Sequence, residues 1–180
     1  MTAAAAPDLS IIIPVFRARD TLARALASID VPAGLTAEII LSADDGDDYS
    51  AFAHENPMVR LVTSPEQRTG PGPARNRGVA AARGAFLSYL DADDSWSPGY
   101  LAALLPLARH EGCAFAATVI ETPEGEALAQ FPPGAPRRLM LPDFARWGAS
   151  FHPVHAAGLP RGRAEGPFWN APAQDVMHAV

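Results

Sequence analysis

Three aspartates, Asp91, Asp93 and Asp94, directly follow the apolar stretch of residues 85–90 (AFLSYL). That stretch has the composition of a buried strand, whereas neighbouring carboxylates repel one another and lose hydration when they are buried. A chain that only turns at this point needs one Asp or Asn with a Gly. A divalent cation such as Mg²⁺ or Mn²⁺ binds oxygen ligands and relieves the repulsion, and substrate phosphates usually complete its coordination shell. The cluster therefore predicts a metal site that binds a diphosphate, with a solvated acidic turn as the alternative.

A second acidic group, residues 44–48 (DDGDD), follows the apolar stretch of residues 37–43. A third apolar stretch, residues 9–16, ends with Pro14 and Phe16. Ligands of open α/β sheets bind beyond the carboxyl ends of the strands. Three strand ends with polar or aromatic side chains therefore predict one shared site. Read alone, residues 44–48 are equally consistent with a solvated turn.

The elements that must position these side chains alternate along the chain. This alternation predicts an α/β fold with a mostly parallel central sheet flanked by helices. We expect strands over residues 9–16, 37–43, 58–64, 85–90 and 113–121, and helices over residues 21–29, 49–56, 73–84 and 97–112. Pro106 is expected to interrupt or bend the last helix. Beyond them we expect a hairpin or lid over residues 122–138, a short helix over residues 141–147, and a final segment, residues 151–180, that covers one end of the sheet and helps to form the site.

The composition is that of one globular domain, with 48% hydrophobic and 19% charged residues in a chain of 180. A net charge of −6 argues against general nucleic-acid binding, and no apolar run is long enough to predict a membrane span. The single cysteine, Cys113, excludes an internal disulfide and is consistent with a reducing, cytoplasmic compartment. His152 and His155 match no strong metal-binding spacing, so we expect ordinary surface or core positions for both.

The glycine-rich segment of residues 70–78 (GPGPARNRG) does not match a phosphate-binding loop. Pro71 and Pro73 remove amide donors, and Arg75 stands where a dinucleotide fingerprint has its last glycine. Arg75 and Arg77 are candidates for contact with a base or a phosphate from the start of a helix. The alternative is that both lie on an exposed helix face.

In their order and spacing these motifs resemble the family 2 glycosyltransferases of the GT-A fold. The resemblance covers residues 8–105 and returns at Gln174-Asp175, where the family often has Glu-Asp. Its most specific part is ARNRG followed by LDADD. Phe16 and Arg17 stand where the family usually has Tyr-Asn.

The resemblance implies a role for each matching residue. Asp91 and Asp93 match the DxD motif, which holds Mn²⁺ or Mg²⁺ on the diphosphate of a nucleotide sugar. Asp175 matches the general base that deprotonates the acceptor hydroxyl, with a plain helix N-terminal carboxylate as the alternative. The implied nucleotide-binding residues are Pro14, Phe16, Asp44, Asp45, Arg75 and Asp91, with Asp44 or Asp45 receiving the N–H of the base.

The expected function is that of a metal-dependent, inverting glycosyltransferase with a nucleotide-diphosphate sugar, UDP-linked, as donor. A carbohydrate or a lipid-linked molecule is the expected acceptor, in the cytoplasm or at the inner face of a membrane. Residues 1–7 are expected to be a disordered lead-in, residues 8–121 the nucleotide-binding part, and residues 122–180 a partial acceptor-side part, either cut from a longer protein or belonging to a minimal relative. Two alternatives stay open, namely a non-catalytic nucleotide-sugar-binding module and a nucleotidyltransferase. The segment PVFRARD lacks the glycine-rich basic loop that a nucleotidyltransferase should have there.

Overall fold

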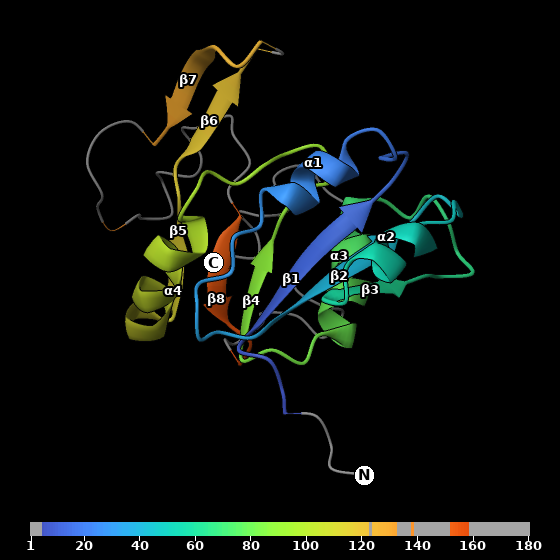
Figure 1. Ribbon diagram of the computed structural model, residues 1–180, viewed down its shortest axis with the longest axis horizontal. Coiled ribbons are helices and arrows are strands. Elements are labelled where there is room, and N and C mark those ends of the chain that lie inside the picture. The colour runs from blue at the N-terminus through green and yellow to red at the C-terminus, as the bar shows by residue number, and fades with distance from the viewer. Residues whose placement is uncertain (1–4, 123, 133–137, 139–151, 159–180) are drawn as a thin grey trace.

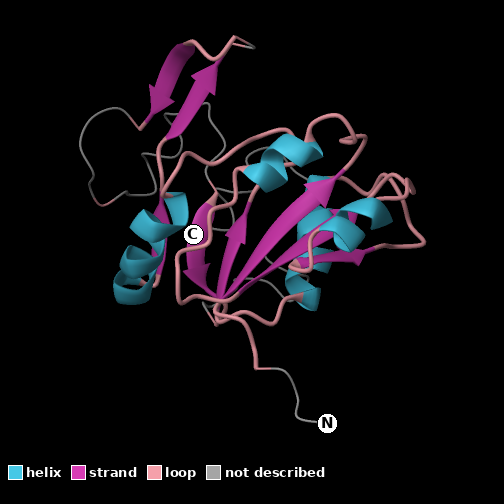
Figure 2. Cartoon of the chain, viewed as in Figure 1, coloured by secondary structure: helices cyan, strands magenta, loops and turns pink. Residues whose placement is uncertain are grey.

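The protein has an α/β fold in which helices pack on both faces of a central sheet (Figure 1, Figure 2). The computed structural model describes residues 5–122, 124–132, 138 and 152–158. The elements in chain order are β1 (Leu9–Val15), α1 (Leu22–Ala27), β2 (Ala37–Ala43), α2 (Ser50–Glu55), β3 (Val59–Val62), α3 (Pro71–Ala81), β4 (Phe86–Tyr89), α4 (Tyr100–Glu111), β5 (Cys113–Phe115), β6 (Thr118–Glu121), β7 (Ala127–Phe131) and β8 (Pro153–Ala156).

The larger sheet has the strand order β3-β2-β1-β4-β8-β5. Strand β1 lies parallel to β2 and to β4, and β2 lies parallel to β3. Strand β8 is antiparallel to both of its neighbours, β4 and β5. The predicted α/β class with a mostly parallel central sheet is confirmed. Because parallel strands end at the same edge, the segments that follow β1, β2 and β4 lie next to one another (Figure 1).

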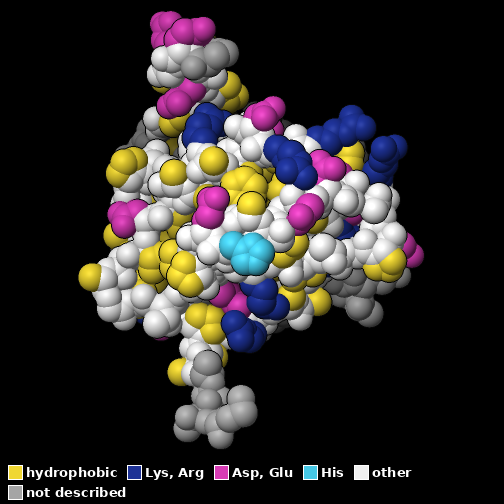
Figure 3. All heavy atoms as spheres, turned by 45° about the vertical axis from the view of Figure 1, so that its right-hand side comes forward, with side chains coloured by type: hydrophobic (Ala, Val, Ile, Leu, Met, Phe, Trp, Pro, Cys, Tyr) yellow, Lys and Arg dark blue, Asp and Glu magenta, His cyan; other side chains and the backbone are white. Residues whose placement is uncertain are grey.

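The predicted single strand over residues 113–121 is wrong, because the chain leaves the large sheet after β5. Strand β5 pairs with β8 only as far as Phe115, which lies opposite Pro153. Proline has no N–H to continue the ladder. The chain then forms β6, which pairs with β7 in a separate antiparallel hairpin. The sequence predicted a hairpin or a lid over residues 122–138, and the observed hairpin overlaps the first part of that range. Figure 3 shows acidic side chains at the tip of this projecting hairpin.

The helices in the described part of the chain are short, and none of them is both long and apolar enough to cross a membrane. Helix α4 runs from Tyr100 to Glu111 with Pro106 inside it. Of the two predicted effects of the proline, an interruption of the helix is therefore wrong, and a bend stays a prediction. Leu101, Leu104 and Ala108 are buried on one face of α4. Burial of this apolar stripe stabilises the helix and offsets the hydrogen bond that proline cannot donate.

The core lies on both faces of the large sheet because its central strands are mostly apolar, with Ser10, Glu38, Ser42 and Ser88 as the buried polar or charged residues among them. One cluster packs Ile11 and Ile13 of β1 with residues of α1 and α4, such as Leu22 and Leu104. A smaller cluster on the other face packs Ile12 of β1 with residues of α3 and β4. Strands that are covered on both faces have a nearly continuous apolar sequence, which is the pattern of residues 9–16 and of residues 39–41 in β2.

Replacement of Gly84 by Ala is expected to lower the free energy of unfolding by about 2 kcal/mol, a typical cost of overpacking. A Cβ at Gly84 would lie 2.5 Å from Ser10 N and 2.6 Å from Leu9 C, which are main-chain atoms of β1 and cannot move aside. Urea unfolding measures the change. Gly158→Ala is the matched control, because a Cβ at Gly158 meets nothing within 4 Å. Equal stability of the two variants would contradict the prediction.

Candidate active site

A cavity of about 590 Å³ lies beyond the carboxyl ends of β1, β2 and β4. The predicted residues that line it are Pro14, Phe16, Asp44, Asp91 and Asp93. Phe16 is 45% exposed although it is a large aromatic residue, so its ring is available to a ligand. The three strand ends therefore form one shared space, as their sequences predict. Of the predicted residues that the structure describes, Asp45 and Arg75 do not line it.

Asp44, at the end of β2, is 3% exposed and ties two segments of the site together. Its carboxylate accepts hydrogen bonds from Thr69 Oγ1 at 2.6 Å, Gly70 N at 2.9 Å and Arg77 Nη2 at 2.6 Å. Burial raises the pKa of Asp44, but the bonds from Thr69, Gly70 and Arg77 outweigh it and hold the pKa below its usual value. The ionised carboxylate thus fixes the loop that leads into α3.

Asp45 fixes the turn that follows β1. Its carboxylate accepts hydrogen bonds from Arg17 N at 2.5 Å, Asp47 N at 3.0 Å and the Tyr49 hydroxyl at 2.8 Å. Burial raises its pKa, but these donors outweigh burial and lower it. Three protein donors contact this carboxylate, and its expected contact with a base stays a prediction.

Asp91, at the end of β4, contacts a buried arginine and a histidine from a distant segment. Its Oδ1 accepts a hydrogen bond from Arg75 Nη2 at 2.6 Å, and Arg75 is 2% exposed. Its Oδ2 lies 3.5 Å from Nε2 of His152, the residue before β8. Burial raises the pKa of Asp91, but the charges of His152 and Arg75 outweigh it and lower the pKa. The alternative prediction, that Arg75 lies on an exposed face of its helix, is therefore wrong because the side chain is buried.

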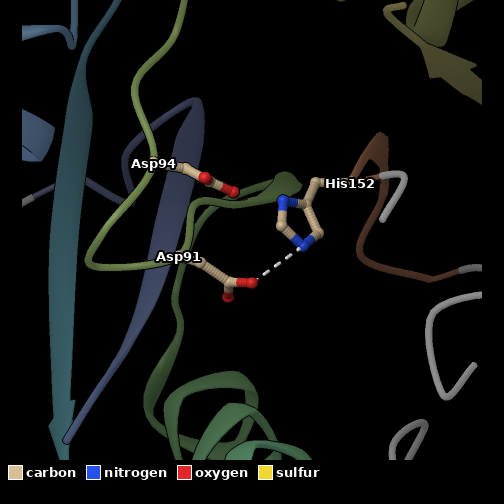
Figure 4. A group of neighbouring side chains, drawn as sticks. All are labelled: Asp91, Asp94 and His152. Carbon is tan, nitrogen blue, oxygen red and sulfur yellow. Dashed lines mark ion pairs between the residues drawn. The ribbon is translucent and has the colours of Figure 1, made fainter. Parts of the chain in front are cut away.

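Asp91, Asp94 and His152 form a group that can hold a cation. Figure 4 shows the three side chains directed toward one another, with Asp91 and Asp94 on one segment and His152 on another. One ligand atom of each lies within 4.8 Å of the others. Burial, followed by repulsion from Asp91 and Asp93, raises the pKa of Asp94. A bound cation would relieve this repulsion, and carboxylate ligands suit Mg²⁺ and Mn²⁺.

His152 is held in place by residues that follow the aspartates. The Tyr100 hydroxyl donates a hydrogen bond to the main-chain oxygen of His152 at 3.0 Å. The Tyr100 ring stacks on Trp96, with ring centroids 4.4 Å apart. The segment that carries Asp91 and Asp94 therefore also positions the histidine that faces them.

The predicted site residues differ in how the structure places them. Asp93 lines the cavity and is exposed, and its main-chain oxygen accepts a hydrogen bond from Arg24. It is not part of the three-residue group found among the described residues. Asp175 lies outside the described residues, as does the short helix expected over residues 141–147. His152 lies at the site although its spacing predicted an ordinary position, and it belongs to the segment of residues 151–180 that was expected to help form the site.

Arg77 and His155, which the sequence pairs with Arg75 and His152, make contacts within the protein. Arg77 bonds Asp44, so it too is not a simple surface residue. His155 is buried, and its Nε2 lies 3.0 Å from the Tyr89 hydroxyl, which fits the expected core position. The contact of His152 with Asp91 could not be read from spacing, because 61 positions of sequence separate the two residues.

Most of the chain is similar to known proteins. The sequence model described as "Glycosyl transferase family 2" matches residues 10–161. Succinoglycan biosynthesis protein ExoO of Rhizobium meliloti (strain 1021) is 31% identical over 160 residues, which are 84% of this chain and 46% of that protein. The GalNAc(5)-diNAcBac-PP-undecaprenol beta-1,3-glucosyltransferase of Campylobacter jejuni is 31% identical over 132 residues, 69% of this chain and 42% of that protein. The chain spans less than half the length of these two relatives.

The fold is also similar to solved structures. The crystal structure of S. aureus TarS 1-349 matches with a TM-score of 0.61 at 18% identity, over 83% of this chain and 47% of that chain. The complex of TarS 1-349 with UDP-GlcNAc matches with a TM-score of 0.50 at 20% identity, over 72% of this chain and 37% of that chain. At these identities the likeness concerns the fold alone, which is the predicted GT-A fold.

Proposed function

This chain belongs to glycosyl transferase family 2, and from that premise we propose that it transfers a sugar from a nucleotide-diphosphate sugar to an acceptor hydroxyl. Membership confirms the resemblance of the sequence motifs and leaves the nucleotidyltransferase alternative without support. The observation that carries the proposal is the cavity, which is bordered by an exposed aromatic ring from the end of β1 and by aspartates from the ends of β2 and β4. Residues 8–121 form the proposed donor-binding part, and residues 122–180 form the proposed acceptor-side part. His152 belongs to the second range by sequence but lies beside Asp91 and Asp94 of the first.

The nucleotide is proposed to lie over the ends of β1 and β2. Phe16 offers an aromatic face to the base, and Pro14 and Asp44 line the same cavity. Asp44 Oδ2 accepts a hydrogen bond from Gly70 N, and a carboxylate oxygen can accept a second one, such as that from the N–H of uracil. The TarS complex with UDP-GlcNAc supports a UDP-linked donor. Asp45 and Arg75 do not line the cavity, and we propose that they position residues that do, namely Arg17 and Asp91.

The chain's residues fit a divalent cation at the end of β4. Arg75 holds Asp91 Oδ1, so Oδ2 is the oxygen that faces Asp94 and His152. Asp91 with Asp94 and His152, and Asp93 as the motif predicts, would hold Mn²⁺ or Mg²⁺. When bound, such an ion neutralises charge on the departing diphosphate. The chain's own part is to keep Asp91 ionised and the ligand atoms in place.

Mn²⁺ affinity is expected to fall by about tenfold or more in both Asp94→Asn and His152→Ala, the usual range for losing part of a metal site. Isothermal titration of the protein with MnCl₂ measures it without turnover. Asp93→Asn, measured in parallel, shows whether the motif's second aspartate also binds the ion. Asp47→Asn is the control, because Asp47 is exposed and pairs with Arg19 outside the cavity. Unchanged affinity in Asp94→Asn and His152→Ala would exclude the three-residue group as the metal site.

The acceptor side of the proposal rests on Asp175. A hydroxyl is a weak nucleophile, so we propose that the Asp175 carboxylate takes its proton as it attacks the sugar from the face opposite the diphosphate, which inverts the anomeric centre. The name of the Campylobacter jejuni relative contains PP-undecaprenol, which supports a lipid-linked acceptor. With such an acceptor, we propose that the protein acts in the cytoplasm at the inner face of a membrane.

The experiment that tests the function combines binding and turnover. Calorimetry with UDP and GDP, each with and without Mn²⁺, is expected to show binding of one nucleotide that Mn²⁺ strengthens. Release of the nucleotide from a panel of nucleotide sugars then tests catalysis. Asp175→Asn should keep nucleotide affinity and lose turnover. Binding without any sugar release would instead favour the non-catalytic binding module.

A further inference from the structure

Two arginines beside the cavity share an uncommon backbone conformation. Arg17 (φ 52°) and Arg68 (φ 57°) are the non-glycine residues with positive φ in the part of the chain that the structure describes. Both line the cavity. A left-handed φ is sterically unfavourable for a residue with a Cβ, and it persists mainly where surrounding contacts enforce it, often at ligand sites. That both instances border one cavity points to a shared role.

The two aspartates that follow β2 hold both backbones. Arg17 N donates to Asp45 Oδ2 at 2.5 Å, and the same oxygen accepts from the Tyr49 hydroxyl at 2.8 Å. Arg68 N donates to the main-chain oxygen of Asp44 at 2.6 Å. The turn after β2 therefore fixes the points at which both arginine side chains leave the main chain.

The charges of the two guanidinium groups are available to a ligand. Among the described residues, no carboxylate lies within ion-pair distance of Arg17 or Arg68, whereas the cavity carboxylates Asp44 and Asp91 are each paired with an arginine of α3. The guanidinium of Arg17 lies 5.3 Å from the ring centroid of Phe16, a contact that leaves its charge unneutralised.

We propose that Arg17 and Arg68 bind the diphosphate of the donor directly and neutralise part of its charge without a metal. The inference rests on the proposed donor site and deepens it. Guanidinium groups bind phosphate oxygens through charge-assisted, often bidentate hydrogen bonds. A diphosphate would then be held between the two arginines and the aspartates at the end of β4. Its affinity should have a component that persists when divalent ions are removed.

The test measures binding in EDTA to UDP, GDP, uridine and inorganic pyrophosphate by calorimetry. The Arg17→Gln/Arg68→Gln double variant keeps both main-chain N–H groups and removes the two charges. It is expected to weaken UDP and pyrophosphate binding by about tenfold or more, the loss typical of hydrogen bonds to charged groups, and uridine binding by less than about twofold. Arg19→Gln is the matched control, because Arg19 lies in the same turn but pairs with exposed Asp47 outside the cavity, and it should leave UDP affinity within about twofold.

Three results would overturn the proposal. The first is unchanged UDP affinity in the double variant. The second is an equal loss of affinity for uridine and for UDP, which would indicate that the arginines contact the base. The third is a loss of UDP affinity of the same size in Arg19→Gln. Wild-type protein that binds pyrophosphate but neither nucleotide would contradict the proposed donor, while loss of that pyrophosphate binding in the double variant would still support the arginine pair.

Discussion

Replacement of Asp91 by Asn is expected to slow sugar transfer by at least about 100-fold, the usual loss when one charge-stabilising group is removed from an active site. Asp91 lies 2.6 Å from Arg75 and 3.5 Å from His152, and it belongs with Asp94 to the group that can hold a cation. Asn has nearly the same size but no charge to offer the ion. Release of UDP from a UDP-sugar in the presence of Mn²⁺ measures the effect.

The substitution also removes the counterion of the buried Arg75, so a loss of folding must be separated from a loss of chemistry. Thermal unfolding of Asp91→Asn identifies the temperature range in which the variant is folded, and turnover is compared within that range. Asp47→Asn removes an exposed carboxylate from the neighbouring loop and should keep turnover within about twofold. A folded Asp91→Asn protein with wild-type turnover would contradict the role of Asp91.

The central strands could be predicted from the sequence because burial on both faces leaves a local signature. Strand β2 begins and ends at the predicted residues 37–43, and β1 ends at Val15, one residue before the predicted end. Helix α3 starts at Pro71, two residues before the predicted Pro73, because proline suits the first turn of a helix at either position. These predictions needed only the period and composition of single segments.

Strand β8 and its histidines could not be predicted in this way. The strand lies between β4 and β5 and is antiparallel to both, so its place depends on pairings with residues far away in the sequence. Val154 and His155 are buried, and His155 satisfies its ring nitrogens with Tyr89 and the Ala156 carbonyl, contacts that a spacing rule does not contain. The position of His152 beside Asp91 follows from this strand, which explains why sequence alone gave it an ordinary role.

The acidic turn after β2 shows where composition predicts a site but not the division of labour within it. Asp44 and Asp45 have the same side chain in adjacent positions, and either was a candidate to receive a base N–H. The structure gives Asp44 to the cavity and to Arg77, whereas Asp45 holds the main chain of Arg17. Adjacent residues at a strand end point in opposite directions, so which carboxylate faces the cavity depends on a register that the sequence does not state.

Glu38→Gln is expected to lower the free energy of unfolding by about 3 kcal/mol, because it breaks a buried charge network. This network lies near the start of β2, at the opposite end of the strand from the cavity. The Glu38 side chain is 7% exposed. It accepts hydrogen bonds from Ser10 Oγ at 2.7 Å, Arg83 N at 2.7 Å and Arg60 Nη2 at 3.1 Å. An amide of the same shape can accept through one atom only, and its NH₂ group meets donors. Urea unfolding at pH 7 measures the change, and Glu55→Gln, at an exposed helix end, is the control.

The pH dependence of that difference separates charge from packing. Burial raises the pKa of Glu38, but the bonds from Ser10, Arg83 and Arg60 outweigh it, so the pKa lies below its usual 4.5 in the folded protein. Such a group binds fewer protons folded than unfolded, so its stabilisation is complete above pH 4.5 and is lost as the pH falls through the folded pKa. Other carboxylates titrate alike in both proteins and cancel in the comparison. The stability difference between wild type and Glu38→Gln should therefore shrink as the pH falls below 4.5, and a difference that stays constant would attribute the loss to packing of the amide.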